Sequence, residues 1–280
     1  MAVFVSASDE SDGGHHRSKF WHGGWLAPET DWYTYFAPAW QERVLDSEPK
    51  IPFLHMTDIR DPQWLSAHHI TWDEAQEKLD AAAVTIAQMG SLHPIATNSN
   101  AGAFIDAHGK KKIVQNIRDK RAYRYLVDHF SFNVYVFAVL DYIHHEHPST
   151  EKVDFVVELK EGVFDKLKQF YDTFADSLAY LHRPELIKYL GELTAVSKER
   201  IPVQAADMLC WHISRADLGL LKGRDELRAA MIFNRYANPI DIQDEIHFAL
   251  AKKFTETLNE SKDGVSKVRR HNERTNPGAS

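Results

Sequence analysis

The sequence has few of the features that mark secreted or membrane proteins. Cys210 is the one cysteine in 280 residues, so no disulfide can form within the chain, which is typical of a reducing cytoplasm. No stretch approaches about 18 uncharged apolar residues, the length that a membrane-spanning helix needs. Residues 1–7 lack a basic start, and the acidic Asp9 and Glu10 follow soon after, which does not fit a secretory signal. We therefore expect a cytoplasmic protein without a membrane segment.

The motifs of several common enzyme classes are also missing. The sequence contains no Gly-x-x-x-x-Gly-Lys-Ser/Thr, no Gly-x-Gly-x-x-Gly and no Gly-x-Ser-x-Gly, so triphosphate, dinucleotide and serine-hydrolase sites lack support. Neither His-Glu-x-x-His nor Cys-x-x-Cys occurs. His144 and His147 lie three residues apart at a predicted helix end, where a zinc site and plain solvent exposure both stay open and the helix dipole favours exposure.

The formal net charge of −7 argues against a grip on nucleic acid that is spread over the whole surface. Such binding would need a local basic patch, and residues 110–124 supply one, in which Lys111, Arg118 and Arg121 share a stripe if the segment is helical. A solvated helix face is the alternative interpretation of this stripe. Residues 261–280 are polar and rich in Lys, Arg, Asn and Gly, a composition that predicts a mobile tail.

Apolar runs predict the strands. Residues 2–8 indicate a buried strand, and residues 20–26 indicate its hairpin partner, in which the glycines mark a bulge or a close backbone approach. Residues 153–159 and 193–196 predict two more strands. Shorter or less regular strands are expected at 53–56 and within 91–104.

Helical patterns alternate with these strands, over residues 29–47, 72–89, 111–146, 164–181, 202–215 and 224–259. Thr30 is the expected cap of the first, and Thr71 with Glu74 forms a capping box for the second. The pattern leaves open a break near 130–133. Strands interleaved with long helices predict an α/β fold with a mixed sheet flanked by helices. We expect one domain over residues 1–260, with a helical insertion near 60–147.

Three carboxylates stand where a carboxylate is costly unless it is paired or metal-bound. Asp9 leaves the end of an apolar strand, Glu158 ends a second one, and Asp207 interrupts an otherwise apolar helix. Acids brought together at strand ends are suited to Mg²⁺, which prefers oxygen ligands. Two such ions can activate a water and stabilise a leaving oxygen at a phosphodiester. The alternative is that each acid caps a helix or pairs with Lys or Arg.

Two segments resemble a known family. The start, Val3-Phe4-Val5-Ser6-Ala7-Ser8-Asp9-Glu10-Ser11, with the aromatic Phe20–Leu26 after it, is similar to the opening of the group called domain of unknown function 3800. The run from Ser197-Lys198 through Gln204-Ala205-Ala206-Asp207 resembles the late helix of that family. Asp12 departs from the pattern, because the family usually has Gly there.

The resemblance implies a ribonuclease-H-like fold, in which an acid from the first strand, one from a middle strand and one from the last helix converge on divalent metal. Matched residue by residue, these are Asp9, Glu158 and Asp207. We add Glu10, Gln204 and Lys198 as supporting residues. Gln204 lies three residues before Asp207 and shares its helix face, so it either orients Asp207 or a water, or is a buried amide bonded to backbone. Lys198 either approaches the scissile phosphate or is a solvated loop lysine, and Asp58 is a reserve ligand that more simply caps a turn.

The sequence therefore supports two hypotheses. The first is a Mg²⁺- or Mn²⁺-dependent nuclease with Asp9, Glu158 and Asp207 as metal-binding and catalytic residues. The second is a non-catalytic interaction module that keeps the fold, with a partner site on the aromatic-rich segment of Trp32, Tyr33, Tyr35, Phe36 and Trp40. The alternative interpretation of this segment is plain core, which is the commoner role of a helix that alternates Trp, Tyr and Phe. The choice between DNA and RNA, and the oligomeric state, stay open.

Overall fold

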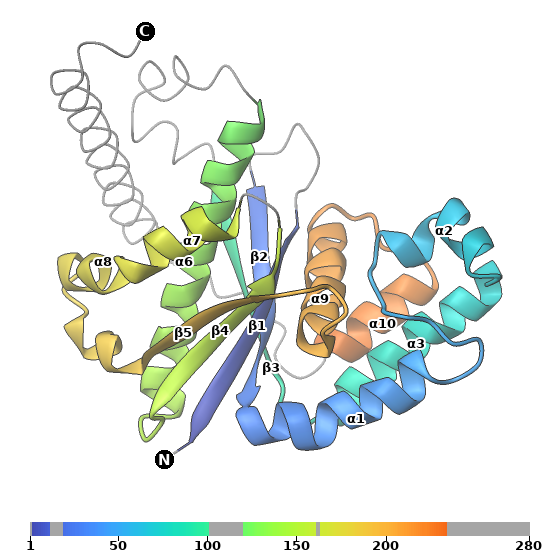
Figure 1. Ribbon diagram of the computed structural model, residues 1–280, viewed down its shortest axis with the longest axis horizontal. Helices are drawn as coiled ribbons and strands as arrows, with labels where there is room; N and C mark the ends of the chain where they lie inside the picture. Colours follow the sequence, from blue (N-terminus) through green and yellow to red (C-terminus); the bar gives the residue numbers. More distant parts are fainter. Residues whose placement is uncertain (1, 12–18, 101–119, 161–162, 234–280) are drawn as a thin grey trace, which may run out of the picture.

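The computed structural model describes residues 2–11, 19–100, 120–160 and 163–233 (Figure 1). Its centre is a five-stranded mixed sheet with the order β3-β2-β1-β4-β5, so the expected α/β fold with a mixed sheet flanked by helices is confirmed. Neighbours β1 and β2 are antiparallel, as are β2 and β3, whereas β4 is parallel to both β1 and β5. The strands are β1 (Val3–Ser11), β2 (Lys19–Pro28), β3 (His93–Asn100), β4 (Lys152–Glu158) and β5 (Leu190–Val196).

The parallel pairing of β1 with β4 decides where the acids lie. The register joins Ser8 to Val157, the last pair of this ladder, so Asp9 and Glu158 follow side by side at the same edge of the sheet. Three of the predicted strands, at residues 2–8, 20–26 and 153–159, thus form the centre of the sheet.

Helices cover both faces of the sheet (Figure 1). One face packs against α6 (Lys120–Glu146), α7 (Phe164–Asp172), α8 (Phe174–Tyr180) and η4 (Pro184–Tyr189). The other side of the sheet carries η1 (Asp31–Phe36), α1 (Ala37–Trp40), η2 (Gln41–Leu45), η3 (Asp58–Arg60), α2 (Pro62–Ala67), α3 (Trp72–Gln88), α9 (Ile201–Asp217) and α10 (Arg224–Phe233). Of these, α9 packs directly on β1 and β2, and α10 packs on α3 and α9. In the described part of the chain, no helix is both long and apolar enough to cross a membrane.

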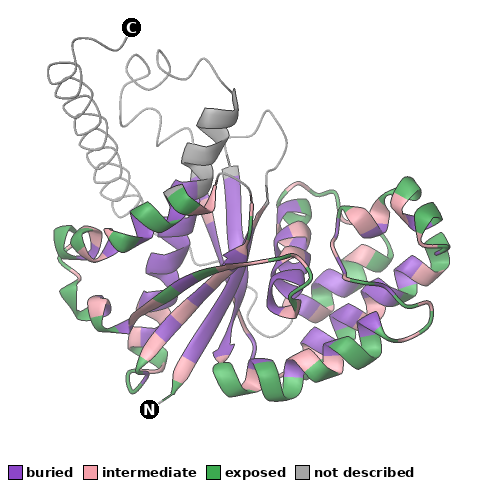
Figure 2. Ribbon diagram, viewed as in Figure 1, coloured by how far each residue is buried: buried purple, intermediate pink, exposed green. Residues whose placement is uncertain are grey.

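Strand alternation builds two cores, one on each side of the sheet. Phe4 and Phe155 point toward α6, whereas Val5 and Ala7 point toward α9. Because both faces are covered, the central strands are buried almost throughout, as the purple strands in Figure 2 show. Two buried serines of β1 have hydrogen-bond partners: Ser6 Oγ lies 2.8 Å from Tyr135 Oη, and Ser8 Oγ lies 3.0 Å from His22 Nε2.

The aromatic-rich segment belongs mainly to the core. Residues Asp31–Leu45 form a continuous helical segment, on which Trp32, Phe36 and Trp40 recur every four residues and are fully buried. Of the two interpretations of this segment, core is therefore correct for these three and a partner surface is wrong for them, whereas Tyr33 and Tyr35 are exposed. The expected cap is also wrong, because Thr30 is itself helical and its side chain makes no capping bond.

Other boundaries follow local chemistry. Thr71 and Glu74 form both bonds of the predicted capping box, and α6 is continuous through residues 130–133. The helix predicted over 164–181 is instead two helices, α7 and α8, which meet at Thr173. The segment 53–56 is not a strand. The stretch near 60–147, where we expected a helical insertion, contributes α2, α3, the edge strand β3 and α6, and the predicted tail at 261–280 lies outside the described residues.

The close approach of β1 and β2 at Gly24 can be tested by substitution of this glycine. A Cβ atom there would overlap the Ala7 carbonyl oxygen and lie 2.7 Å from Ser8 Cα, so the strands would have to separate. We expect Gly24→Ala to lower the free energy of unfolding by about 2–3 kcal/mol in urea denaturation. Gly219→Ala is the control, because Gly219 has φ +64° and no atom within 4 Å of a new Cβ; it should cost about 1 kcal/mol from backbone conformation alone. A Gly24 variant as stable as the control would contradict this account.

Candidate functional site

The three predicted acids line one narrow pocket. Asp9 comes from the end of β1, Glu158 from the end of β4 and Asp207 from the middle of α9. The pocket has a volume of about 10 Å³, roughly that of one water molecule or ion. Its lining is completed by Leu54, His55, Lys198, Val203 and Gln204. The fold thus brings the three acids, which are far apart in the sequence, to the wall of one pocket.

Contacts between α9 and the two central strands hold this geometry. Cys210 Sγ donates to the carbonyl oxygens of Asp9, at 3.0 Å, and of Gly23, at 3.3 Å. Trp25 Nε1 donates to Ala205 O at 2.9 Å. Asp207 lies one helical turn before Cys210, so the bond that fixes Cys210 to the backbone of Asp9 also brings Asp207 to the end of β1.

A lysine that sequence reasoning missed lies among the acids. Lys160 Nζ is 3.3 Å from Asp9 Oδ1 and 3.5 Å from Glu158 Oε2, and it also donates to Glu10 Oε1. The available signal was the spacing, because Lys160 follows Glu158 by two residues, the period that puts side chains of an extended chain on the same side. Glu10, predicted as a supporting residue, joins the site through this lysine.

Burial and charge shift the pKa values of these carboxyls in different directions. Burial raises the pKa of Asp9 well above its usual value, against the attraction of Lys160. Burial also raises the pKa of Asp207 to about 7, opposed by the Met56 N–H and reinforced by Glu158. At Glu10 burial acts upward too, but the charge and hydrogen bond of Lys160 outweigh it and lower the pKa to about 2. Lys160 therefore stabilises the ionised form of Glu10 most strongly. The ionised forms of Asp9 and Asp207 are less well stabilised.

The backbone of the segment 54–56 is bonded to side chains of α9. Leu54 N donates to Gln204 Oε1 at 3.0 Å, and Met56 N donates to Asp207 Oδ2 at 2.6 Å. His55 lies between them, with Nε2 3.9 Å from Asp207 Oδ2. The apolar pattern at 53–56 predicted a strand, but these backbone groups bond to side chains of α9, a long-range pairing that no local pattern encodes.

The other predicted supporting residues have identifiable partners. Gln204 Oε1 also accepts from Trp40 Nε1 at 3.0 Å, and its Nε2 donates to Glu199 O at 2.8 Å, so this amide organises the pocket wall through backbone and core contacts. Lys198 Nζ donates to Asp58 Oδ2 at 2.8 Å and lies 4.3 Å above the Phe53 ring. Asp58, our reserve ligand, is thus paired with Lys198 and does not line the pocket.

The donor set suits a hard divalent cation in its chemistry, because Asp9, Glu158 and Asp207 offer carboxylate oxygens in one small pocket. Over the residues that the structure describes, however, no three His, Cys, Asp or Glu side chains are grouped closely enough to hold a metal ion. Asp9 and Glu158 both contact the ammonium of Lys160, which lies between them. The site thus has the ligand types for Mg²⁺ or Mn²⁺, with a lysine between them.

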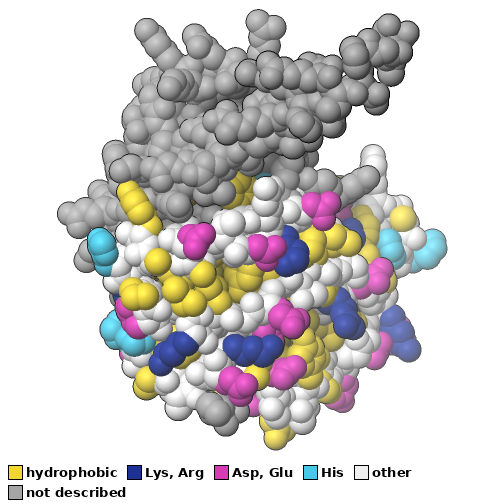
Figure 3. Space-filling model, turned by 60° about the vertical axis from the view of Figure 1, so that its left-hand side comes forward, with side chains coloured by type: hydrophobic (Ala, Val, Ile, Leu, Met, Phe, Trp, Pro, Cys, Tyr) yellow, Lys and Arg dark blue, Asp and Glu magenta, His cyan; other side chains and the backbone are white. Residues whose placement is uncertain are grey.

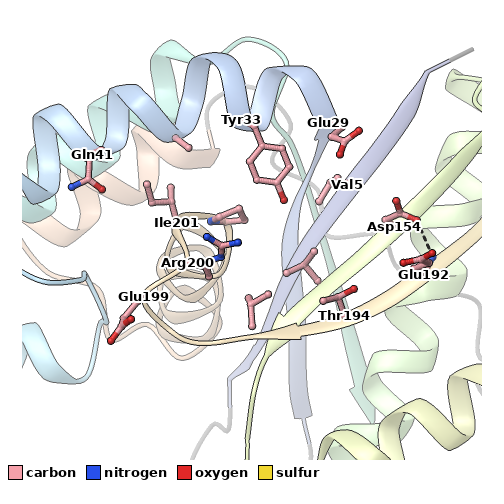
Figure 4. A pocket seen from close by; sticks show the side chains of 14 residues that line it. Val5, Glu29, Tyr33, Gln41, Asp154, Glu192, Thr194, Glu199, Arg200 and Ile201 are labelled. Carbon is pink, nitrogen blue, oxygen red and sulfur yellow. Dashed lines mark hydrogen bonds between the residues drawn. The ribbon is translucent and has the colours of Figure 1, made fainter.

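A second and larger pocket lies on the same face of the sheet, between β4, β5, η1 and the start of α9 (Figure 4). Its volume is about 410 Å³, the size of a small-molecule site. Tyr33, 52% exposed, and Arg200 line it together with the acids Glu29, Asp154, Glu192 and Glu199. Acids therefore outnumber Arg200, the one basic residue of the lining.

The predicted nucleic-acid stripe cannot be placed against this site. Lys111 and Arg118 lie outside the described residues, and Arg121 lies in α6 at a position whose side chain is not among those described. On the face shown in Figure 3, Lys and Arg side chains are interspersed with Asp and Glu. Comparison with protein-family models, curated proteins and solved structures finds no match to this chain.

Gln204 is the first test of how the pocket is built. Gln204→Leu removes the acceptor of the Trp40 indole and of the Leu54 amide, and leaves these buried donors unpaired. We expect a loss of about 2–4 kcal/mol in the free energy of unfolding, with faster hydrogen exchange at the Leu54 amide. Gln41→Leu, at an exposed glutamine, should stay within about 0.5 kcal/mol of wild type. Equal effects of the two changes would refute the positioning role of Gln204.

Asp207 is the second test, through the pH dependence of stability. With its pKa raised from 3.8 to about 7 in the fold, its favourable contribution is present below pH 3.8 and is lost as the pH rises through 7. Asp207→Asn carries no charge, and its carbonyl oxygen can still accept from Met56 N. We expect the variant to gain about 1–3 kcal/mol over wild type at pH 8 and much less at pH 5, in metal-free thermal melts. Asp172→Asn, an exposed control, should show no such trend. A variant that melts lower at pH 8 would indicate a structural charge pair instead.

Proposed function

We propose that this protein is a divalent-metal-dependent phosphodiesterase with a ribonuclease-H-like fold, acting on nucleic acid. The observation that carries the proposal is the convergence of Asp9, Glu158 and Asp207, from β1, β4 and α9, on one pocket. These are the elements from which the resemblance to domain of unknown function 3800 implies metal-binding acids. A cytoplasmic setting belongs to the same proposal.

The residues divide into ligands and supports. Asp9, Glu158 and Asp207 would hold Mg²⁺ or Mn²⁺, which supplies an activated water and stabilises the leaving oxygen of a phosphodiester. Glu10 holds Lys160, and Gln204 fixes the segment that donates to Asp207. Asp9 is buried, and Glu158 and Asp207 are partly buried, so the carboxylates act at a lower local dielectric, where their interactions with cations are stronger than in water.

One set of contacts favours a second candidate, a non-catalytic binding module. Lys160 already neutralises part of the acid cluster, which is how a buried charge group is stabilised without any metal. In that case the binding surface is the larger pocket, to which the aromatic segment contributes the exposed ring of Tyr33. Metal response separates the two candidates, because a binding module of this kind gains no stability from Mn²⁺.

Cleavage assays test the first candidate directly. The purified chain is incubated with single-stranded and duplex DNA and RNA in millimolar Mn²⁺ or in EDTA. We expect metal-dependent cleavage that falls about 100-fold or more in Glu158→Gln, because a neutral amide removes a ligand charge. Asp172→Asn, which exchanges an exposed acid on α7, is the matched control and should cleave at the wild-type rate. Cleavage unaffected by Glu158→Gln, or absent on all four substrates, would contradict the proposal.

A further inference from the structure

Lys160 has an unusual place for a salt-bridged lysine. Its ammonium contacts carboxylates from two parallel strands, Asp9 and Glu10 on β1 and Glu158 on β4. Asp9 and Glu158 line the acid pocket, whereas Glu10 does not. Asp207 also lines this pocket but forms no ion pair with Lys160. One positive charge therefore faces four acidic side chains at this edge of the sheet, and the group as a whole can still attract cations.

The other cations around this site do not take that role. Lys198 lines the same pocket, but its ammonium is bound to Asp58 and lies over Phe53. Arg60 is paired with Asp225 and lies 4.0 Å above the Trp211 ring. Among the described residues, His55 Nε2 lies 3.9 Å from Asp207 Oδ2, and Lys160 is the lysine that contacts Asp9 and Glu158.

The attachment of Lys160 allows it to leave. Its backbone is fixed, because the amide of the preceding Leu159 donates to Val196 O at 2.7 Å, but its side chain is 36% exposed. Arg228 shows the opposite case: its side chain is 0% exposed and is bound to Asp80, Asp225 and Gln76, so it has no route to water. A flexible four-carbon stem with a strongly hydrated head can reach both the carboxylates and solvent.

We propose that Lys160 is a tethered counter-ion of the metal-free site, and that a divalent cation binds to the acids by displacing its ammonium. This inference rests on the function proposed above. An ammonium 3.3 Å from Asp9 Oδ1 and 3.5 Å from Glu158 Oε2 repels a metal ion bound to the same carboxylates, so each cation weakens the binding of the other. Lys160 thereby sets the metal concentration at which the site fills, as a competitor within the chain.

The test measures Mn²⁺ affinity by titration calorimetry on the full chain. Lys160→Met removes the competing charge and keeps the length of the side chain, so we expect Mn²⁺ to bind about tenfold more tightly than to wild type. Lys160→Arg keeps the charge and should bind like wild type. Lys198→Met is the matched control from the same pocket and should change the affinity by less than about twofold, because its ammonium is held by Asp58.

The possible results have distinct meanings. Equal Mn²⁺ affinity in wild type and Lys160→Met overturns the role of Lys160 and leaves the proposed function standing. No Mn²⁺ binding by either protein overturns the proposed function, and this inference with it. A second measurement needs no variant: acetic anhydride should acetylate Lys160 several-fold faster in wild type when Mg²⁺ is added, with Lys198 unchanged. An unchanged rate at Lys160 would overturn the inference even if Lys160→Met failed to fold.

Discussion

The cost of buried negative charge governs this end of the molecule. Asp9 and Asp207 are buried far enough for desolvation to be the largest influence on their pKa values. Two groups offset this cost: the Lys160 ammonium, which follows β4 and pairs with Asp9, and the Met56 amide, which precedes η3 and donates to Asp207 on α9. Since these groups come from distant parts of the chain, the acid pocket can form only when the whole sheet and its α9 side are in place.

The helix α9 links that pocket to the core. Its apolar residues Ala205, Met208 and Leu209 pack against the sheet with no exposed surface, while Gln204 and Asp207 on the same helix bond to the segment 54–56. Packing that fixes the rotation of α9 therefore also fixes Asp207. For this reason a single acid in an otherwise apolar helix is an informative signal: it is tolerated because partners are arranged to meet it.

The sequence predicted features with local causes and missed those with distant ones. Apolar runs located β1 and β4, and the parallel register of these strands places the acids at their ends side by side. The capping box of Thr71 and Glu74 was also predicted, because it is a contact within one turn of helix. The strand predicted at 53–56 failed because its backbone partners lie about 150 residues away on α9. Lys160 was missed for the same reason. In the sequence, a charged residue after a strand predicts solvated surface, and only the pairing of β4 with β1 brings Asp9 and Glu10 beside it.

The two pockets constrain how a polyanion could reach the acids. Asp154, Val156 and Glu158 alternate on one face of β4, so the larger pocket and the acid pocket lie along the same strand, about 13 Å apart from Asp154 to Glu158. Glu29, Asp154, Glu192 and Glu199 around the larger pocket oppose phosphate groups, and Arg200 offsets only one of these four charges. If the substrate is a nucleic acid, its backbone should therefore approach from the edge of the sheet where β1 and β4 end. Lys160 lies at that edge, so its ammonium, once displaced by a metal ion, would be next to the incoming phosphates.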